Sequence, residues 1–137
     1  MARASSVLPF VLIPKGVVNL AFGAGLVLAP QALLTLYGAK AAEGVALLPR
    51  LLGLALLALA AVQILGRKAE DSHLRTVLIG AFAAADLVGL ALVVAAQLAG
   101  AMNPLGWSVV AIFTYAGLGF AFAFLLECGA GEAKPRG

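Results

Sequence analysis

The residue most able to do chemistry in this sequence is a single carboxylate, Asp86. It lies in the middle of an apolar stretch, between the small and aliphatic residues at 83–85 and 87–89. An acid at the centre of a membrane-spanning helix costs about 2.5–3.5 kcal/mol on insertion scales, so it needs a hydrogen-bonding partner, a proton or water. Ala83 and Gly89 share its face at helical periodicity, and small residues let helices approach closely. We therefore expect Asp86 to point into a helical bundle.

Three other polar side chains are expected at a similar depth. Asn19 lies within the first apolar stretch, and Thr114 and Tyr115 lie within the last. Hydrogen bonds from these groups would make Asp86 a structural clasp, whereas an acid that exchanges protons would be a relay or a ligand site. Both interpretations stay open, although no second acid or histidine is found at this depth to complete a proton path.

Two basic residues border the same region. Arg50 follows Pro49 just inside the second apolar stretch. Its guanidinium either extends to the outer headgroups or reaches inward to Asp86, about a turn and a half deeper. Lys15 is predicted to be an anchor that extends to the cytoplasmic interface. His73, the single histidine, is predicted to be a solvated loop residue rather than a pigment ligand.

Motifs of soluble enzymes are absent from the chain. The sequence contains no G-x-S-x-G, H-E-x-x-H, C-x-x-C or phosphate-binding G-x-x-x-x-G-K pattern. A single cysteine, Cys128, excludes an internal disulfide and any multi-cysteine metal site. We expect no catalytic residue set, no metal site and no cofactor, which favours a protein that is not an enzyme.

The segments that must position these residues are four apolar stretches, at 7–28, 45–65, 76–98 and 105–126. Each is about 20 residues long, the length that a helix needs to cross ~30 Å of hydrocarbon. The chain is 64% hydrophobic and 11% charged, whereas soluble domains are about 45–50% apolar and about 25% charged. The sequence predicts an all-α fold, a polytopic membrane four-helix bundle with antiparallel up-down-up-down order. One domain at 1–128 is followed by a flexible tail at 129–137.

The first stretch allows two registers because Pro30 follows it closely. A helix over 15–37 would contain Pro30, whereas a helix from about Val7 would end before it. The second register is favoured, because proline is tolerated better at the start of a helix than inside one. Residues 31–38 would then form a short interfacial helix, and Asn103-Pro104 would begin the last span.

The basic residues predict the orientation. With the N-terminus inside, the inner segments contain seven of them and the outer segments contain only Lys40 and Arg50. This asymmetry predicts that both termini are cytoplasmic in a bacterial inner membrane. Because the basic residues form no patch interleaved with aromatics, no nucleic-acid partner is expected.

Several short motifs resemble those of a broad set of small bacterial four-span proteins that are loosely similar to the DoxX-like group. They are L-A-P at 28–30, L-Y-G at 36–38, P-R-L-L-G at 49–53, A-A-D-L-V-G at 84–89 and L-G-W at 105–107. The resemblance covers about 7–126 and implies the four-span fold alone, because no catalytic residue set matches.

Three functions are compatible with these features. The leading hypothesis is a non-catalytic accessory or scaffold subunit of a membrane assembly, with lipid, other membrane subunits or a second copy as partners. One alternative is a small ion-coupled transporter that uses Asp86. The other, which rests mainly on the resemblance, is a quinone- or lipid-handling membrane redox component.

Overall fold

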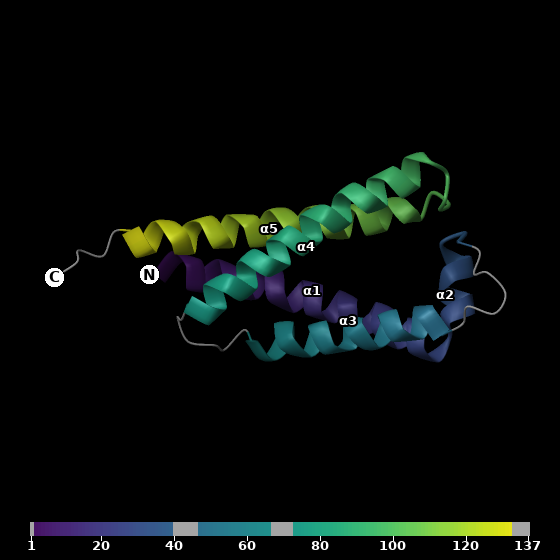
Figure 1. Cartoon of the computed structure of the whole chain (residues 1–137), viewed down its shortest axis with the longest axis horizontal. Helices are drawn as coiled ribbons and strands as arrows, with labels where there is room; N and C mark the ends of the chain where they lie inside the picture. Colours follow the sequence, from purple (N-terminus) through teal and green to yellow (C-terminus); the bar gives the residue numbers. More distant parts are fainter. Residues whose placement is uncertain (1, 40–46, 67–72, 133–137) are drawn as a thin grey trace.

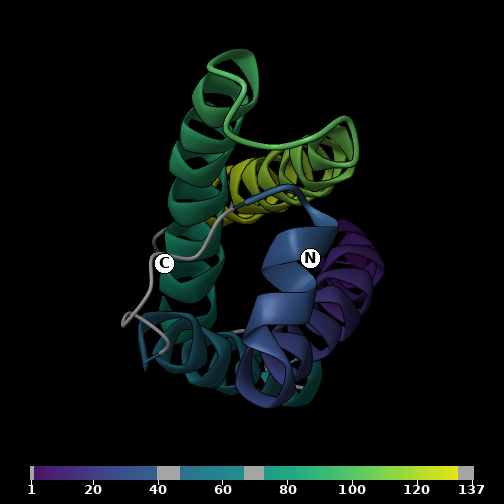
Figure 2. The same ribbon diagram turned by 90° about the vertical axis from the view of Figure 1, so that its right-hand side faces the viewer.

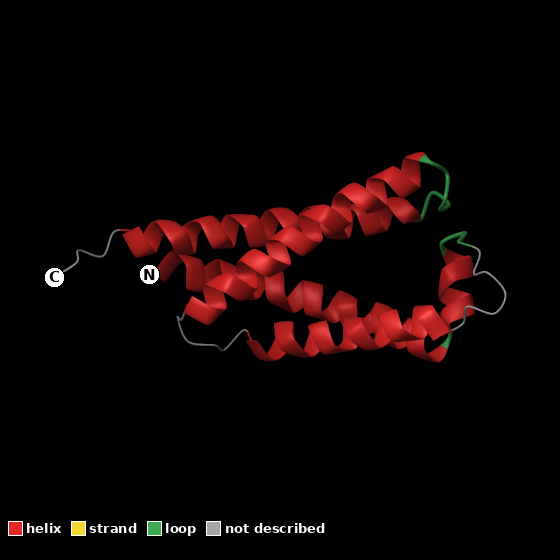
Figure 3. Ribbon diagram, in the orientation of Figure 1, coloured by secondary structure: helices red, strands yellow, loops and turns green. Residues whose placement is uncertain are grey.

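The chain folds into helices of two very different lengths. The computed structural model describes residues 2–39, 47–66 and 73–132. In these ranges it contains helices and no strand (Figure 3). The elements are α1 (Ala2–Leu28), α2 (Pro30–Leu36), α3 (Leu47–Gly66), α4 (His73–Leu98) and α5 (Gly106–Glu132). The predicted all-α fold is confirmed. α5 continues to Glu132, into the segment predicted to be a tail, and residues 133–137 lie outside the described ranges.

Four of the helices are long and apolar enough to cross a bilayer. They span Val7–Leu28, Leu47–Gly66, His73–Leu98 and Gly106–Gly129, with mean hydropathies between 1.8 and 2.4. The four stretches predicted from the sequence coincide with these helices to within a few residues. The prediction of a multi-pass membrane protein is therefore confirmed at the level of helix length and composition.

Proline decides where the first long helix ends. α1 stops at Leu28, and Pro30 begins α2 after a break at Ala29, whose φ is −141°. This is the favoured register of the first span, and a helix over 15–37 is excluded. α1 starts earlier than expected, at Ala2, and it tolerates Pro9 and Pro14 in its interior. α2 lies across the end of the bundle, steeply inclined to the long helices (Figure 1).

The long helices associate as two pairs. α1 packs along α3 and α4 packs along α5, and α1 and α5 join one pair to the other (Figures 1 and 2). The buried apolar cluster between the pairs comes from α1, α4 and α5 and consists of Leu8, Val11, Leu12, Ile79, Ala83, Ala116, Phe120 and Ala123. α1 begins and α5 ends at the same end of the molecule (Figure 1).

A polar contact connects the two pairs at the end opposite the termini. The Asn103 side chain donates to Leu36 O over 2.8 Å, and its backbone N–H donates to Tyr37 O over 2.9 Å. Its Oδ1 also accepts from Leu105 N at 3.0 Å, as a cap before α5 would. Gly38 approaches Asn103 closely with φ +73°, a conformation that glycine adopts without strain. Asn103 thus binds the end of α2 to the turn between α4 and α5.

Two glycines bring the backbones of α1 and α3 into contact. A Cβ on Gly53 would lie 2.8 Å from Gly23 O, and a Cβ on Gly23 would lie 2.9 Å from Gly53 O. Neither position has room for a methyl group. Small residues are the usual means by which membrane helices approach closely, because lipid supplies no hydrophobic force between them.

Gly53→Ala is expected to lower the free energy of unfolding by about 1–3 kcal/mol, since the added methyl group forces α1 and α3 apart. Gly66→Ala is the matched control, because nothing lies within 4 Å of a Cβ at that position in the same helix. Reversible unfolding in bicelles would measure both variants. Equal stability of the two would contradict the close contact of α1 with α3.

Candidate intramembrane polar site

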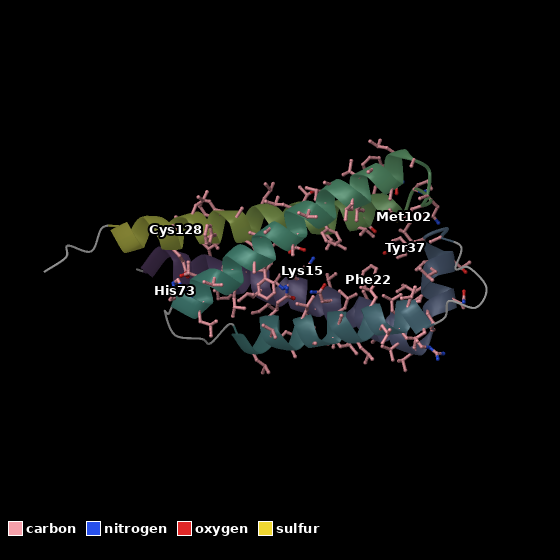
Figure 4. All side chains as sticks on the ribbon, viewed as in Figure 1. Lys15, Phe22, Tyr37, His73, Met102 and Cys128 are labelled. Carbon is pink, nitrogen blue, oxygen red and sulfur yellow. The ribbon has the colours of Figure 1, made fainter. Side chains whose placement is uncertain are left out.

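Asp86 and Lys15 form an ion pair inside the bundle. Lys15 Nζ donates to Asp86 Oδ1 over 2.7 Å, and the two side chains are 6% and 9% exposed. Asp86 lies at the middle of α4, and Lys15 lies near the middle of the first span. Figure 4 shows Lys15 about midway along the bundle, where α4 crosses α1. The prediction that Asp86 points into the bundle is confirmed.

The prediction for Lys15 is wrong. A lysine that anchors at the interface must lie close to a helix end, but α1 begins at Ala2 and places Lys15 halfway along its length. Its side chain is turned toward α4 and α5, and Nζ lies 4.3 Å from the centre of the Phe113 ring. An ammonium over an aromatic face is attracted by the quadrupole of the ring, and the attraction increases when water is excluded.

Phe113 reaches this position because α4 has a glycine beside it. A Cβ at Gly89 would clash with the Phe113 ring. Gly89 lies three residues after Asp86 and therefore on nearly the same face of α4. The carboxylate and the ring consequently lie on adjacent sides of one ammonium group. We call Asp86 and Phe113, with Gly89 beneath the ring, the acid–aromatic cage.

A second polar pair lies one turn along α1. Asn19 Nδ2 donates to Gln63 Oε1 over 2.9 Å, and both residues are buried. Asn19 follows Lys15 by four residues, so the two side chains leave α1 on one face, and Asn19 meets α3 while Lys15 meets α4. Sequence reasoning missed Gln63, although it is the single strongly polar residue between Leu51 and Leu65.

The remaining predicted partners of Asp86 bind elsewhere. Thr114 Oγ1 donates to Val110 O within its own helix over 2.8 Å. Tyr115 donates its hydroxyl to Phe10 O over 2.5 Å. Pro14 has no N–H, so the Phe10 carbonyl four residues earlier lacks its helical donor. Tyr115 supplies that donor from α5.

Arg50 does not reach the site either. It lies in the first turn of α3 and is exposed, so the alternative in which it pairs with Asp86 is wrong. Asn19, Thr114 and Tyr115 are equally wrong as hydrogen-bonding partners of Asp86. The role of these residues and of Asp86 in binding a ligand stays a prediction.

Another ion pair lies nearer the termini, between α4 and α5. Arg75 Nη2 lies 2.6 Å from Glu127 Oε1, and Thr76 Oγ1 donates to Glu127 Oε2 over 2.9 Å. Sequence reasoning treated Arg75 as an inner-loop cation, but α4 begins at His73 and buries it. His73 itself is exposed at the start of α4.

The arrangement at mid-depth can hold one cation. Asp86 supplies the single negative charge, Lys15 neutralises it, and the Phe113 ring adds a neutral electron-rich face. Among the described residues, no three His, Cys, Asp or Glu side chains come together as they would around a metal ion. An ammonium–carboxylate pair with these neighbours can exchange a proton or give up its ammonium for another monovalent cation.

Comparisons with known proteins give no relative from which a role could be taken. No protein-family model, curated protein or solved structure matches this chain. The resemblance to DoxX-like proteins and the quinone- or lipid-handling role that it suggests stay predictions.

Lys15→Met and Asp86→Leu are each expected to lower the free energy of unfolding by about 3–5 kcal/mol, because each leaves one charge buried without its partner. The double variant removes both charges and should lie within about 1 kcal/mol of the wild type, since apolar pairs can replace buried ion pairs. Steric-trapping measurements in bicelles would give the three values. A double variant as unstable as the sum of the single variants would show that the two side chains do not interact.

Proposed function

We propose that this protein is a non-catalytic accessory subunit or scaffold that binds a partner membrane helix along α4. The observation that carries the proposal is an exposed face of that helix in which four of five successive residues are alanines. Ala81, Ala84, Val88, Ala91 and Ala95 are all exposed and follow one another at intervals of three or four residues. At 100° per residue they form one continuous stripe.

The stripe faces away from the protein's own core. The buried residues of α4 are Arg75, Ile79, Ala83 and Asp86, and the members of the stripe lie outside that buried set. Lipid is as apolar as leucine, so helices in a membrane associate by close packing rather than by hydrophobic exclusion. A stripe of small residues lets a second backbone approach, as Gly23 and Gly53 do between α1 and α3.

The pairing of the polar groups at mid-depth is consistent with this role. Lys15 with Asp86, and Asn19 with Gln63, satisfy one another inside the bundle. The outward faces of the long helices are left mainly aliphatic, with leucines, valines and alanines exposed along them. Such faces suit acyl chains and the apolar faces of other membrane subunits.

The proposed orientation has both termini in the cytoplasm of a bacterial cell, with the chain in the inner membrane. It is supported by the start of α1 and the end of α5 at one end of the bundle. The excess of basic residues in the sequence segments predicted to be inside also supports it, and this excess remains when the buried Lys15 and Arg75 are left out.

Ala84→Ile together with Ala91→Ile is expected to abolish a slower-migrating complex on blue-native gels after gentle extraction, because the added side chains keep a partner helix away. Ala58→Ile is the control, since Ala58 is an exposed alanine of α3 with Leu54 and Val62 four residues to either side. The control should leave the complex intact. A monomer band alone in the wild type, or a complex that survives the double substitution, would contradict the proposal.

A second candidate function, an ion-coupled carrier, is favoured by the position of the ion pair. Lys15 belongs to the α1–α3 pair and Asp86 to the α4–α5 pair. Carriers commonly bind their coupling ion near mid-membrane, between two units that move relative to one another. An ion pair across such a boundary is able to link cation binding to the movement of the units.

The carrier predicts that proteoliposomes loaded with a pH-sensitive dye change their internal pH when an inward gradient of sodium, potassium or an organic ammonium ion is imposed. Asp86→Asn should reduce the rate to that of empty liposomes, because the amide cannot hold a cation by charge. Thr114→Val is the control at a similar depth, since Thr114 bonds only within its own helix. Rates that are equal in wild type and Asp86→Asn would exclude the carrier.

A further inference from the structure

The cage around the Lys15 ammonium has the composition of a binding site for an amine. Asp86 Oδ1 lies 2.7 Å from Nζ, and the centre of the Phe113 ring lies 4.3 Å from it. A carboxylate together with an aromatic face is a recurrent means of recognising ammonium groups. We propose that the acid–aromatic cage of Asp86 and Phe113 is a binding site for a monovalent alkylammonium cation, and that Lys15 occupies it as a tethered competitor.

The adjoining space suits the apolar part of such a ligand. A pocket of about 250 Å³, open to the surface, lies between α1 and α5; Lys15 lines it, whereas Asp86 and Phe113 do not. The rest of its lining is Pro14, Val18, Ala111, Ile112 and Tyr115. Because the Tyr115 hydroxyl donates to Phe10 O, this wall offers mainly hydrocarbon and an aromatic ring. Alkyl substituents on the cation would be solvated there as they are by lipid.

Binding of an external cation must be accompanied by the loss of one positive charge from the site. If an external cation takes the carboxylate while Lys15 stays protonated, the second positive charge is left in hydrocarbon without a partner, which is strongly unfavourable. Lys15 therefore releases its proton to water and remains as a neutral amine. The complete exchange is one alkylammonium ion bound to Asp86, one proton released and no change in the charge of the protein with its bound cation.

No other titratable group whose side chain the structure describes faces the cage. Among the long-helix side chains that the structure describes, the remaining titratable groups are exposed or bound elsewhere: Arg50, His73 and Cys128 are exposed, Arg75 lies against Glu127, and Tyr115 donates to Phe10 O. On the side of α3, the buried polar group is Gln63, which does not titrate and is bound to Asn19. Proton release on binding is therefore assigned to Lys15.

Cation binding at the cage deepens the proposed carrier function by naming the class of ion that is carried. It rests on that function only in so far as the bound cation is transported. Binding and proton release are equilibrium properties that a protein without transport activity would retain. They are also independent of whether α4 binds a partner. The absence of transport or of complex formation would therefore not contradict cation binding at the cage. The absence of binding would be detected separately, by titration.

The test is calorimetric titration of n-butyltrimethylammonium into the protein in nanodiscs, with empty nanodiscs as the blank. This probe carries a permanent charge and no ionisable proton, so any proton released comes from the protein. Titrations in buffers of different ionisation enthalpy count the protons released. For the wild type we expect one proton per bound cation, and a dissociation constant that falls about tenfold for each unit rise in pH.

Three variants locate the site. Lys15→Met should bind the probe at least about tenfold more tightly at neutral pH, because the competitor has been removed. Asp86→Asn should lose saturable binding. Phe113→Leu should bind several-fold more weakly while still releasing one proton.

Titration of the wild type alone is sufficient to test the proposal if Lys15→Met folds poorly. Binding without proton release, or no saturable binding to the wild type, would overturn it. Binding that persists unchanged in Asp86→Asn would overturn it as well.

Discussion

The ion pair between Lys15 and Asp86 places two opposite charges 2.7 Å apart at the middle of two facing helices. Hydrocarbon cannot hydrogen-bond to either group, so the rest of the bundle must keep them together. Leu8, Val11 and Leu12 of α1 are buried against Ile79 and Ala83 of α4 and against three residues of α5, which fixes the crossing of α1 with α4. The Phe113 ring, held beside Gly89, then closes one side of the ammonium.

α1 has a central place because polar groups from a short part of it reach every other long helix. The Phe10 carbonyl, freed by Pro14, accepts from Tyr115 of α5. Lys15 bonds to α4, and Asn19 bonds to Gln63 of α3. α3 and α5 each have one long neighbour within their pair, and α1 connects the pairs. A change in the bonding of Lys15 would therefore act on α1, the helix that connects the two pairs. This is the physical reason for considering ion exchange alongside a structural role.

The fold was largely predictable because it follows from composition and spacing. Four apolar stretches of membrane-spanning length and a proline at position 30 determine the helices and the break between α1 and α2. Burial of Asp86 was also predictable, since a lone carboxylate in hydrocarbon must face protein. Its partner was not predictable, because a lysine eight residues into the span can either extend its ammonium to the interface or turn it inward. Which of these occurs depends on how α1 packs against α4 and α5. Pro14 alone predicts that the Phe10 carbonyl needs a hydrogen-bond donor from outside α1. The donor, Tyr115, lies 105 residues away in sequence, and its identity depends on how α1 packs against α5.

The most direct measurement of the central claim is solid-state NMR on the protein in lipid bilayers, with ¹⁵N in the lysine side chains and ¹³C in the aspartate carboxyls. Lys15 and Asp86 are predicted to show a strong dipolar coupling between Nζ and Cγ, with chemical shifts of an ammonium and a carboxylate, as the 2.7 Å contact requires. The coupling should disappear in Lys15→Met and persist in Thr114→Val. A protonated Asp86 with no measurable coupling to Lys15 in the wild type would contradict the account.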